Sequence, residues 1–539
     1  METASGFHGF FVFTHSHNQK VVTAHGLFFI DSPKGKITMH YPSFEQFEKL
    51  SQEGNLIPIY REIMADRETP VSVLTKLNSS PYAFLLESVE GGEKWGRYTF
   101  LGADPQRIFR VSGADVLVQN GKTTQRFSHG GDPLSVLKGI MERYRPVPVE
   151  GLPRFYGGAV GFLAYDMVRY FEKLPDKGAA GVGTDQAVFL ITDTLLIFDN
   201  VRHTIKVVAC VCTEGVDNLR AVYNEGIEKI DKLVDTMATP VREGIQSANR
   251  AAKLQLQSNV SPDEFRAMVT KAKDYIVSGD IIQVVLSQRF ETDNGLDSID
   301  LYRALRYINP SPYLFYLKMD DLVLIGSSPE VMVRLDEGVV ELRPIAGTRK
   351  RGRTEQEDRR LADELLRDEK ERAEHIMLVD LGRNDLGRIA RIGSVQVTQL
   401  MAVERYSHVM HLVSNIRAHL AAERDAFDVL KASFPAGTLT GAPKVRAMEI
   451  IDELESFRRG PYGGAVGYIS FTGNMDLGIT IRTIMIKGEK LYIQTGAGIV
   501  ADSDPSAEYD ETVNKAQAMT QAVRLAAADF DILYNSREE

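Results

Sequence analysis

The sequence predicts an α+β fold in which large, mainly antiparallel sheets are flanked by helices. Short runs such as DVLVQ at 115–119 and TIKVVACV at 204–211 alternate in the way that is typical of half-buried strands. Residues 217–237 repeat apolar residues at helical spacing instead. Near the C-terminus LYIQTG follows ITIRT closely, so strands succeed one another without the alternating helices of a parallel sheet.

Composition and charge limit the class of protein. The chain has 539 residues, 43% hydrophobic and 25% charged, which fits two to four globular domains. The formal net charge of −10 disfavours a nucleic-acid partner, so an anionic ligand needs a local cationic site. No segment reaches the ~18 apolar residues of a membrane helix, and we expect no membrane partner.

The two cysteines, Cys210 and Cys212, alternate in VVACVCT and should lie on one face of a strand. Two neighbouring thiols cannot form a four-ligand zinc site, and a disulfide between them would be strained. We interpret them as packing residues. Sparse cysteine usage fits a reducing compartment, so a cytoplasmic location is expected.

Four parts follow from the pattern along the chain. Residues 1–40 are an N-terminal extension without helical period, in which Met39 is a plausible initiator and the His15 and His17 pair belongs to a solvated tail. The remaining parts are a first domain at 41–237, a polar linker at 238–258 and a second domain at 259–530. The run YGGAVG at 156–161 recurs at 462–467, which indicates either related sheet edges in both halves or coincidence.

Two acidic segments could bring carboxylates together. The run 361–385 predicts a helix that turns into a loop at Gly382, with one side formed by Glu371, Glu374, His375 and Leu378. Because this side runs into the apolar IMLV, Glu374 should lie near a buried region, although a solvated charged face is the simpler alternative.

The second acidic segment starts at Asp504, which suits a helix N-cap, with Pro505 as the first helical residue. Glu508 and Glu511 then share one face, although the helix dipole alone would also favour acids there. If the two segments converge, their carboxylates make the hard-oxygen site that Mg²⁺ prefers.

Several residues could handle an anion. Gly496-Ala497-Gly498 ends an apolar strand, where backbone N–H groups could approach a carboxylate. Arg482 is the single cation of the strand LGITIRT, so it needs either an acidic partner or a bound anion. RPIAGTRKRG at 343–352 predicts a glycine turn with a basic flank. His408 and His411 lie in a predicted strand, where a histidine is either a core group or, beside the carboxylates, a catalyst.

These motifs together resemble the chorismate-binding enzymes, and among them the anthranilate synthase large subunits. The resemblance covers about 261–528 and, more loosely, LLES at 85–88. It rests on RPIAGTRKRG, ERAEHIMLVDLGRND, FPAGTLTGAPK, YGGAVGY, ITIRT, TGAGIVADSDP and EYDE. It implies two intertwined α+β domains, with Mg²⁺ held by Glu374 and Glu511. It further implies that His411 is the acid or base that helps the C4 hydroxyl leave, that Thr438 is catalytic, and that chorismate is contacted by Gly347, Thr348, Tyr462, Arg482, Gly496, Ala497 and Gly498.

The nucleophile separates the members of the family. Water-adding members, the isochorismate and salicylate synthases, carry a lysine where this chain has Gln283, and aminodeoxychorismate synthases carry one at Ala346. With neither lysine, the resemblance implies that ammonia attacks chorismate to give anthranilate and pyruvate, the first step of tryptophan biosynthesis. The alternatives are aminodeoxychorismate synthase component I, some of which lack the lysine, and a non-catalytic tryptophan-sensing subunit.

Partners and regulation complete the expectations. A glutaminase needs a nucleophilic cysteine beside a histidine, and two strand cysteines do not supply one. We therefore expect a separate glutamine amidotransferase subunit, with a heterotetramer as the family default. LLES and NPSPY resemble the family's tryptophan site, which implies feedback inhibition through Ser88, Pro312, Tyr313 and Leu314.

Overall fold

The computed structural model describes residues 39–88, 96–175, 178–241, 255–406, 409–528 and Phe530. Residues 1–38 of the predicted extension lie outside this range, with His15 and His17. So do residues 242–254 of the predicted linker and His408.

The first of two twelve-stranded antiparallel sheets, here called sheet A, combines strands from both predicted domains. Its order is β1 (Leu56–Met64), β10 (Thr204–Cys212), β9 (Thr194–Asp199), β3 (Tyr98–Ala103), β2 (Tyr82–Glu87), β13 (Tyr313–Met319), β14 (Leu322–Ser328), β23 (Thr483–Lys487), β24 (Lys490–Ile499), β12 (Gln283–Asp293) and β11 (Gln257–Ser258), with β20 (Gly441–Ala442) paired to β12.

Sheet B is built in the same way. Its order is β17 (Ile345–Lys350), β19 (Val409–His419), β16 (Val339–Leu342), β15 (Val331–Asp336), β22 (Met475–Ile479), β21 (Ala465–Ser470), β7 (Gly158–Leu163), β8 (Ala187–Thr192), β4 (Arg107–Ser112), β5 (Asp115–Asn120) and β6 (Thr123–Ser128), with β18 (Gln396–Arg405) paired to β19. Apolar side chains of both sheets pack into one core, which also holds Phe155, just before β7, stacked on Tyr468 of β21.

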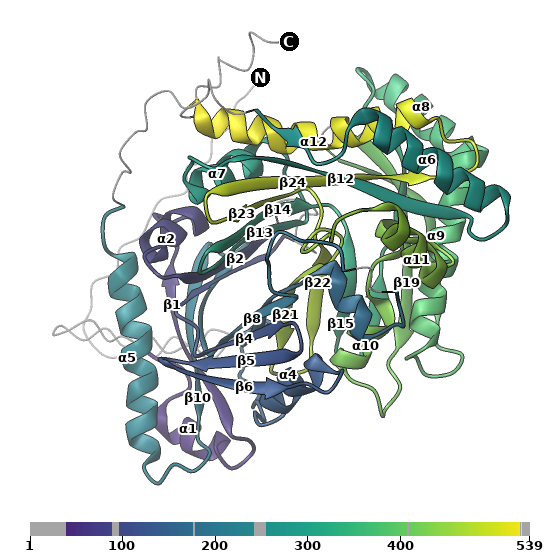
Figure 1. Ribbon diagram of the computed structural model, residues 1–539. Helices are drawn as coiled ribbons and strands as arrows, with labels where there is room; N and C mark the ends of the chain where they lie inside the picture. Colours follow the sequence, from purple (N-terminus) through teal and green to yellow (C-terminus); the bar gives the residue numbers. More distant parts are fainter. Residues whose placement is uncertain are drawn as a thin grey trace, which may run out of the picture. The chain divides into compact units, whose positions relative to one another are not determined.

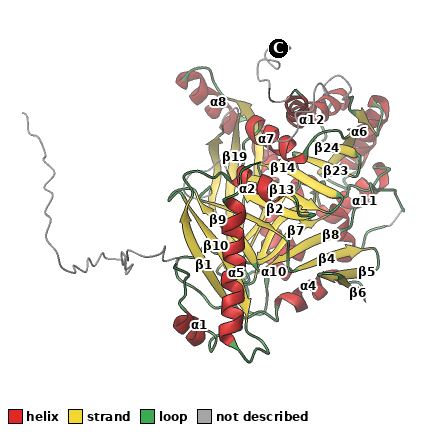
Figure 2. Ribbon diagram, turned by 90° about the vertical axis from the view of Figure 1, so that its left-hand side faces the viewer, coloured by secondary structure: helices red, strands yellow, loops and turns green. Residues whose placement is uncertain are grey.

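Helices cover the outer faces of the sheets. The helices of the first half are α1 (Phe44–Leu50), α2 (Pro70–Leu77), α4 (Pro133–Met141) and α5 (Leu219–Met237), with the 3-10 helix η1 (Tyr165–Tyr170). Those of the second half are α6 (Pro262–Val277), α7 (Ser298–Ile308), α8 (Glu355–Arg367), α9 (Glu369–Gly387), α10 (Ala426–Ser433), α11 (Lys444–Leu454) and α12 (Pro505–Ala527), with the 3-10 helix η3 (Gly437–Leu439). Figure 1 shows α6, α7 and α12 beside β12 and β24, and Figure 2 shows α5 in front of β1 and β10.

The predicted fold class is thereby confirmed, and the repeated motif acquires a meaning. Strands β7 and β21, which carry the two YGGAVG copies, pair with each other antiparallel, and Gly161 lies directly opposite Gly467. A Cβ atom at Gly161 would lie 1.9 Å from the carbonyl oxygen of Val188, and one at Gly467 would lie 2.1 Å from that of Asp476. Glycine is therefore required on both strands of this pair, which we call the seam of sheet B because it joins the first half of the chain to the second. Strands β2 and β13 form the corresponding seam of sheet A.

The two halves repeat one order of elements around these seams. The first half has the order β1-α2-β2-β3-β4-β5-β6-α4-β7-β8-β9-β10-α5. The second half has the order β12-α7-β13-β14-β15-β16-β19-α10-β21-β22-β23-β24-α12, and each of its strands pairs with the counterparts of the strands that its equivalent in the first half pairs with. Side chains repeat as well, because Gly102 lies over Phe84 as Gly326 lies over Phe315. Residues 343–408, with β17, α8, α9 and β18, interrupt the second copy and have no counterpart in the first.

One boundary prediction was wrong. The helix expected to end at Gly382 continues to Gly387, and the break falls at Asp368, which ends α8 and caps α9. Gly382 stays helical because it packs against Ile416 of β19, where a Cβ atom would lie only 2.8 Å from the Ile416 side chain. Among the described residues no helix is long and apolar enough to cross a membrane.

Candidate active site

The floor of the site lies where β24 and β12 run side by side. A Cβ atom at Gly498 would lie 2.7 Å from Nε2 of Gln283, and one at Gly496 would lie 2.7 Å from the Tyr462 hydroxyl. At Gly496 an added Cβ atom would also lie 2.8 Å from the carbonyl oxygen of Leu286, so glycine is required at that position. The side chain of Ala497 is fully buried in the core beneath, so only its backbone could meet a ligand.

Acidic residues of α9 and α12 face this floor. Glu374 accepts a hydrogen bond from Gln283 Nε2 at 3.2 Å and makes no ion pair with any described residue. Burial raises its pKa, although Gln283, Lys370 and Lys515 oppose that shift. Burial also raises the pKa of Glu508, again against Lys370 and Lys515. Lys370 of α9 and Lys515 of α12 thus influence carboxylates of both helices.

Lys515 connects α12 to the floor. Its Nζ lies 2.6 Å from Glu511 and donates to the carbonyl oxygen of Gly496 at 3.0 Å. No three of the described His, Cys, Asp and Glu side chains are close enough to hold a metal ion by themselves. Glu374 and Glu511 are carboxylates, the ligand type that a hard cation such as Mg²⁺ prefers, and in this structure Glu511 is paired with Lys515.

His411 lies on β19, directly across from Thr348 of β17. Its Nδ1 is 3.0 Å from the carbonyl oxygen of Gly347 and 3.1 Å from the Thr348 hydroxyl. Because a carbonyl can only accept, Nδ1 carries the proton and Nε2 is left with a lone pair. Burial lowers the pKa of His411, so the ring is neutral at pH 7 and can accept a proton.

The predicted glycine turn at Gly347 is a bulge within β17 instead. Gly347 has φ +71°, and the pairing of β17 with β19 shifts register between Ala346 and Thr348. The bulge aims the Gly347 carbonyl at His411. Sequence reasoning recognised the glycine, but the paired strand beside it could not be seen.

The strand predicted to carry Arg482 is also interrupted. Arg482 lies between β22 and β23 with φ +50°. No carboxylate among the described residues lies within ion-pair distance of it, so the acidic-partner alternative finds no support. Burial lowers its pKa, while the nearby Tyr462 opposes the shift. The geometry therefore favours the other alternative, a bound anion.

The sequence analysis missed Glu330. This residue lies between β14 and β15, is 8% exposed, and lines a cavity of about 50 Å³ together with Thr438. Burial raises its pKa to about 8, opposed in part by Thr438 and Lys515. Glu330 is thus a carboxylic acid that keeps its proton at neutral pH. An acid between two apolar runs, in VLIGSSPEVMV, was the available signal.

The residues expected to bind tryptophan lie together on sheet A. Ser88 directly follows β2, and Leu314 of β13 pairs with Glu87. Pro312 and Tyr313 lead into the same strand, and the Tyr313 hydroxyl donates to Asp476 of sheet B at 2.7 Å. The structure therefore brings LLES beside NPSPY at the seam between the halves.

Residues 115–521 match the family of chorismate binding enzymes. The chain belongs to this family and is a chorismate-using enzyme of the lyase class.

Within the family the chain groups with the anthranilate synthase component 1 proteins. The one from Acetivibrio thermocellus is 46% identical, over 90% of this chain and 99% of its own length. The anthranilate synthase component 1 of Aquifex aeolicus is 49% identical, over 90% of this chain and 98% of its own length. The crystal structure of anthranilate synthase component I from Streptococcus pneumoniae TIGR4 is 38% identical with a TM-score of 0.71, over 80% of this chain and 95% of that one. The menaquinone-specific isochorismate synthase of Escherichia coli, 20% identical with a TM-score of 0.63 over 89% of this chain and 98% of that one, shares the fold.

Proposed function

We propose that this chain converts chorismate and ammonia into anthranilate, pyruvate and water, as the names of its relatives indicate for them. The observation that carries the proposal is the neutral amide of Gln283, whose Nε2 lies 3.2 Å from Glu374 at the floor of the site. A water-adding enzyme needs a base at this position, whereas ammonia is already a nucleophile. Position 346 is likewise an alanine within β17 and offers no amine.

Four protons move in the reaction: the attacking nitrogen and ring carbon C2 each lose one, and the C4 hydroxyl and the departing enolpyruvate each gain one. Two groups of the site match two of these transfers. The nitrogen forms a bond to ring carbon C2, the double bonds shift, and the C4 hydroxyl leaves as water after taking a proton. Glu330, protonated at pH 7, is the acid for this step. The C2 hydrogen is then lost as a proton while the C3–O bond breaks, and the departing enolpyruvate takes up a proton to become pyruvate. His411, with its free Nε2, is the base.

Binding falls to the remaining residues. Arg482, Tyr462, Thr348 and the backbone of residues 496–498 hold the carboxylates of chorismate. Glu374 and Glu511 would hold Mg²⁺, which, when bound, orients and neutralises the ring carboxylate. Thr438 lines the same cavity as Glu330, and its buried hydroxyl has no hydrogen-bond partner among the described residues, so it is free to meet a ligand there.

Ammonia would come from a partner. The Cys210 thiol is buried, donates to the carbonyl oxygen of Tyr156 at 3.1 Å, and has its pKa raised by burial. Such a thiol is a poor nucleophile. We therefore expect a glutamine amidotransferase subunit, assembled with this chain into a heterotetramer, and tryptophan as an inhibitor bound near Ser88 and Leu314.

Product analysis tests the proposal. The purified chain, given chorismate, Mg²⁺ and ammonium, should form 2-aminobenzoate and pyruvate, and it should form neither when glutamine replaces ammonium. The variant Glu511→Ala should lose activity at low Mg²⁺ concentration. A 4-amino product would make the chain an aminodeoxychorismate synthase component I, and glutamine-dependent turnover without a partner would contradict the assignment of the ammonia source.

A further inference from the structure

A buried histidine next to the metal carboxylates has no role in the reaction described above. His375 lies on α9, directly after Glu374, and is 0% exposed. Its Nε2 lies 2.6 Å from the hydroxyl of Ser414, which is also fully buried. Its Nδ1 finds no hydrogen-bond partner in the part of the chain that the structure describes.

An unsatisfied buried nitrogen costs free energy, about 1–3 kcal/mol in typical cases. An apolar residue of similar size would fill the same space without that cost. The position therefore carries a polar ring for something other than packing. What the ring supplies is a single short and directional bond between α9 and β19.

Ser414 is fixed independently of the histidine. Its hydroxyl accepts the N–H of Met401 at 2.9 Å, at the irregular pairing of β18 with β19. Its own N–H donates to the carbonyl oxygen of Pro344, just before β17, at 3.2 Å. The hydroxyl that receives His375 is thus held by β18, and the Ser414 backbone is held by the residue just before β17.

The face of α9 that meets β17 and β19 carries Glu371 as well, because residues four apart share a side of a helix. Glu371 pairs with Arg349 of β17 at 3.1 Å, and Glu374 turns toward Gln283. Apolar contacts along this face resist separation of helix and strand but set the rotation of the helix about its axis only weakly. The bond at His375 is buried and directional, and together with the Glu371–Arg349 and Asp385–Lys444 pairs it restricts that rotation.

We propose that His375 is a positioning residue which, through Ser414, fixes the rotation of α9 and so the directions in which Glu371 and Glu374 point. This inference rests on the proposed metal site. Residues that orient metal ligands typically change metal affinity 10–100-fold when they are removed.

Metal binding without substrate provides the test, with Mn²⁺ as the probe and calorimetry as the measurement. We expect His375→Met and Ser414→Ala each to weaken binding about 10–100-fold. The two substitutions remove the same bond, so their effects should not add. The variant that carries both should bind Mn²⁺ about as tightly as whichever single variant binds it less tightly. His375→Gln, whose amide can reach the Ser414 hydroxyl, should restore most of the affinity.

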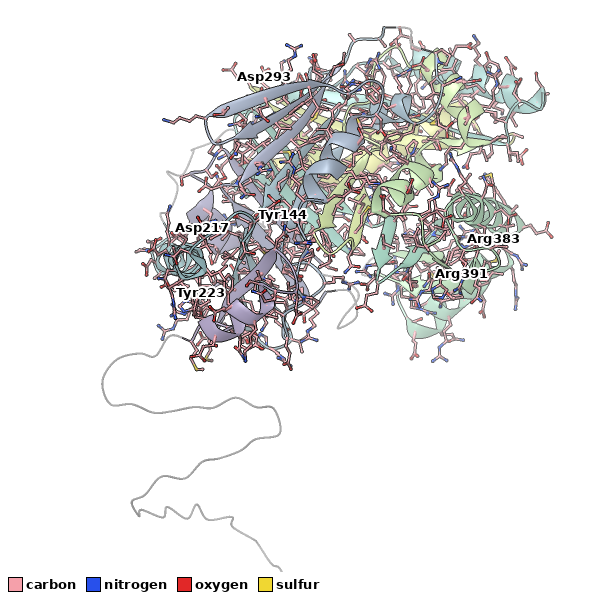
Figure 3. All side chains as sticks on the ribbon, turned by 90° about the horizontal axis from the view of Figure 1, so that it is seen from below. Tyr144, Asp217, Tyr223, Asp293, Arg383 and Arg391 are labelled. Carbon is pink, nitrogen blue, oxygen red and sulfur yellow. The ribbon has the colours of Figure 1, made fainter. Side chains whose placement is uncertain are left out.

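Two control variants separate positioning from loss of stability. Val379→Ala truncates a buried side chain of α9 and should lower the melting temperature without changing Mn²⁺ affinity. Arg383→Ala alters the exposed side of the same helix, where Figure 3 shows the side chain at the surface, and should change neither.

Equal weakening by Val379→Ala, or binding by His375→Met within twofold of the wild type, would overturn the role of His375 alone. Mn²⁺ binding that is absent from the wild type, or that survives Glu374→Gln, would instead overturn the proposed metal site and this inference with it.

Discussion

At the scale of single residues, Glu330 shows how burial prepares an acid for neutral pH. Its pKa of about 8 in the folded chain compares with 4.5 for an exposed glutamate. Between these values the folded state keeps a proton that the unfolded state has lost. Its contribution to stability therefore falls as pH rises from about 4.5 to 8 and is constant above that.

The variant Glu330→Gln should separate activity from stability. We expect kcat to fall ~10²–10⁴-fold, as for loss of a general acid. The melting temperature should rise relative to the wild type, little at pH 5 and by several degrees at pH 8, because the amide is never ionised. Calorimetric scans at both pH values check this. An unchanged melting temperature at pH 8 would contradict the raised pKa, as would a wild-type kcat that does not fall above pH 8.

Arg482 makes a second residue-scale prediction. A half-buried arginine without an acidic partner should bind a substrate carboxylate through charge-assisted hydrogen bonds worth about 1.5–3 kcal/mol. Arg482→Gln should therefore raise KM for chorismate roughly 10–100-fold, with a smaller change in kcat. Steady-state kinetics measure this, and Arg482→Lys, which keeps the charge but loses the planar fork, should fall in between. An unchanged KM for Arg482→Gln would remove this residue from the site.

The candidate site residues that the sequence analysis recognised carry local sequence signals of a kind that Glu330, which it missed, lacks. Glu374 and Glu511 lie on helices whose spacing and capping residues are local signals. Glu330 carries no periodic signal, since its raised pKa arises from strands and a 3-10 helix that are distant in sequence. The positive φ of Arg482 depends in the same way on how β22 and β23 pair with other strands, which is a tertiary property.

At the scale of elements, β17 and α9 act together. The β17 bulge at Gly347 aims a carbonyl at His411, and its left-handed conformation strains any other residue by about 1–2 kcal/mol. A Cβ atom there would also lie 3.1 Å from the Glu371 carboxylate and from the Leu365 side chain. The element thus holds an acid–base group and a carboxylate helix in one arrangement.

Gly347→Ala should therefore lose both stability and catalysis. Gly393 provides a matched control, because its φ is +77° and an added Cβ would meet nothing within 4 Å. Gly347→Ala and Gly393→Ala should both lower the melting temperature, whereas kcat/KM should fall only for Gly347→Ala. Thermal scans and kinetics on both proteins check this. Equal kinetics in the two variants would show that the bulge serves the strand alone.

Single helices and strands were predicted better from the sequence than the pairing between strands. The expected helix at 217–237 is α5, and the strand with both cysteines is β10. Which strand pairs with which is not a local property, so neither sheet could be assembled from the sequence. The copies of YGGAVG were recognised as an echo, but their mutual pairing was visible only in the structure.

At the scale of the whole molecule, the two halves share both sheets. Each half alone would leave β2 or β13, and β7 or β21, as an exposed edge with buried apolar faces uncovered. We predict that residues 39–241 and 255–530, produced separately, are insoluble. Produced together, they should assemble into an active protein.

A protease site placed within residues 242–254 tests the same association of the two halves without producing them separately. After cleavage the two fragments should elute as one species and keep their activity, because the strand pairs at the seams do not depend on that link. Separation of the fragments on size exclusion would show that the seams are weaker than their strand pairing indicates.

The interruption of the second copy at residues 343–408 makes the molecule functionally asymmetric. Tyr462, Lys515 and Glu511 stand on elements that both copies possess, and the first copy has Tyr156, Lys229 and Glu225 at matching places before its strand and in its helix. Thr348 and Glu374 come from the inserted segment. The first copy therefore repeats part of the proposed binding surface but has no counterpart of Thr348 and Glu374, so the architecture provides for one site and not two.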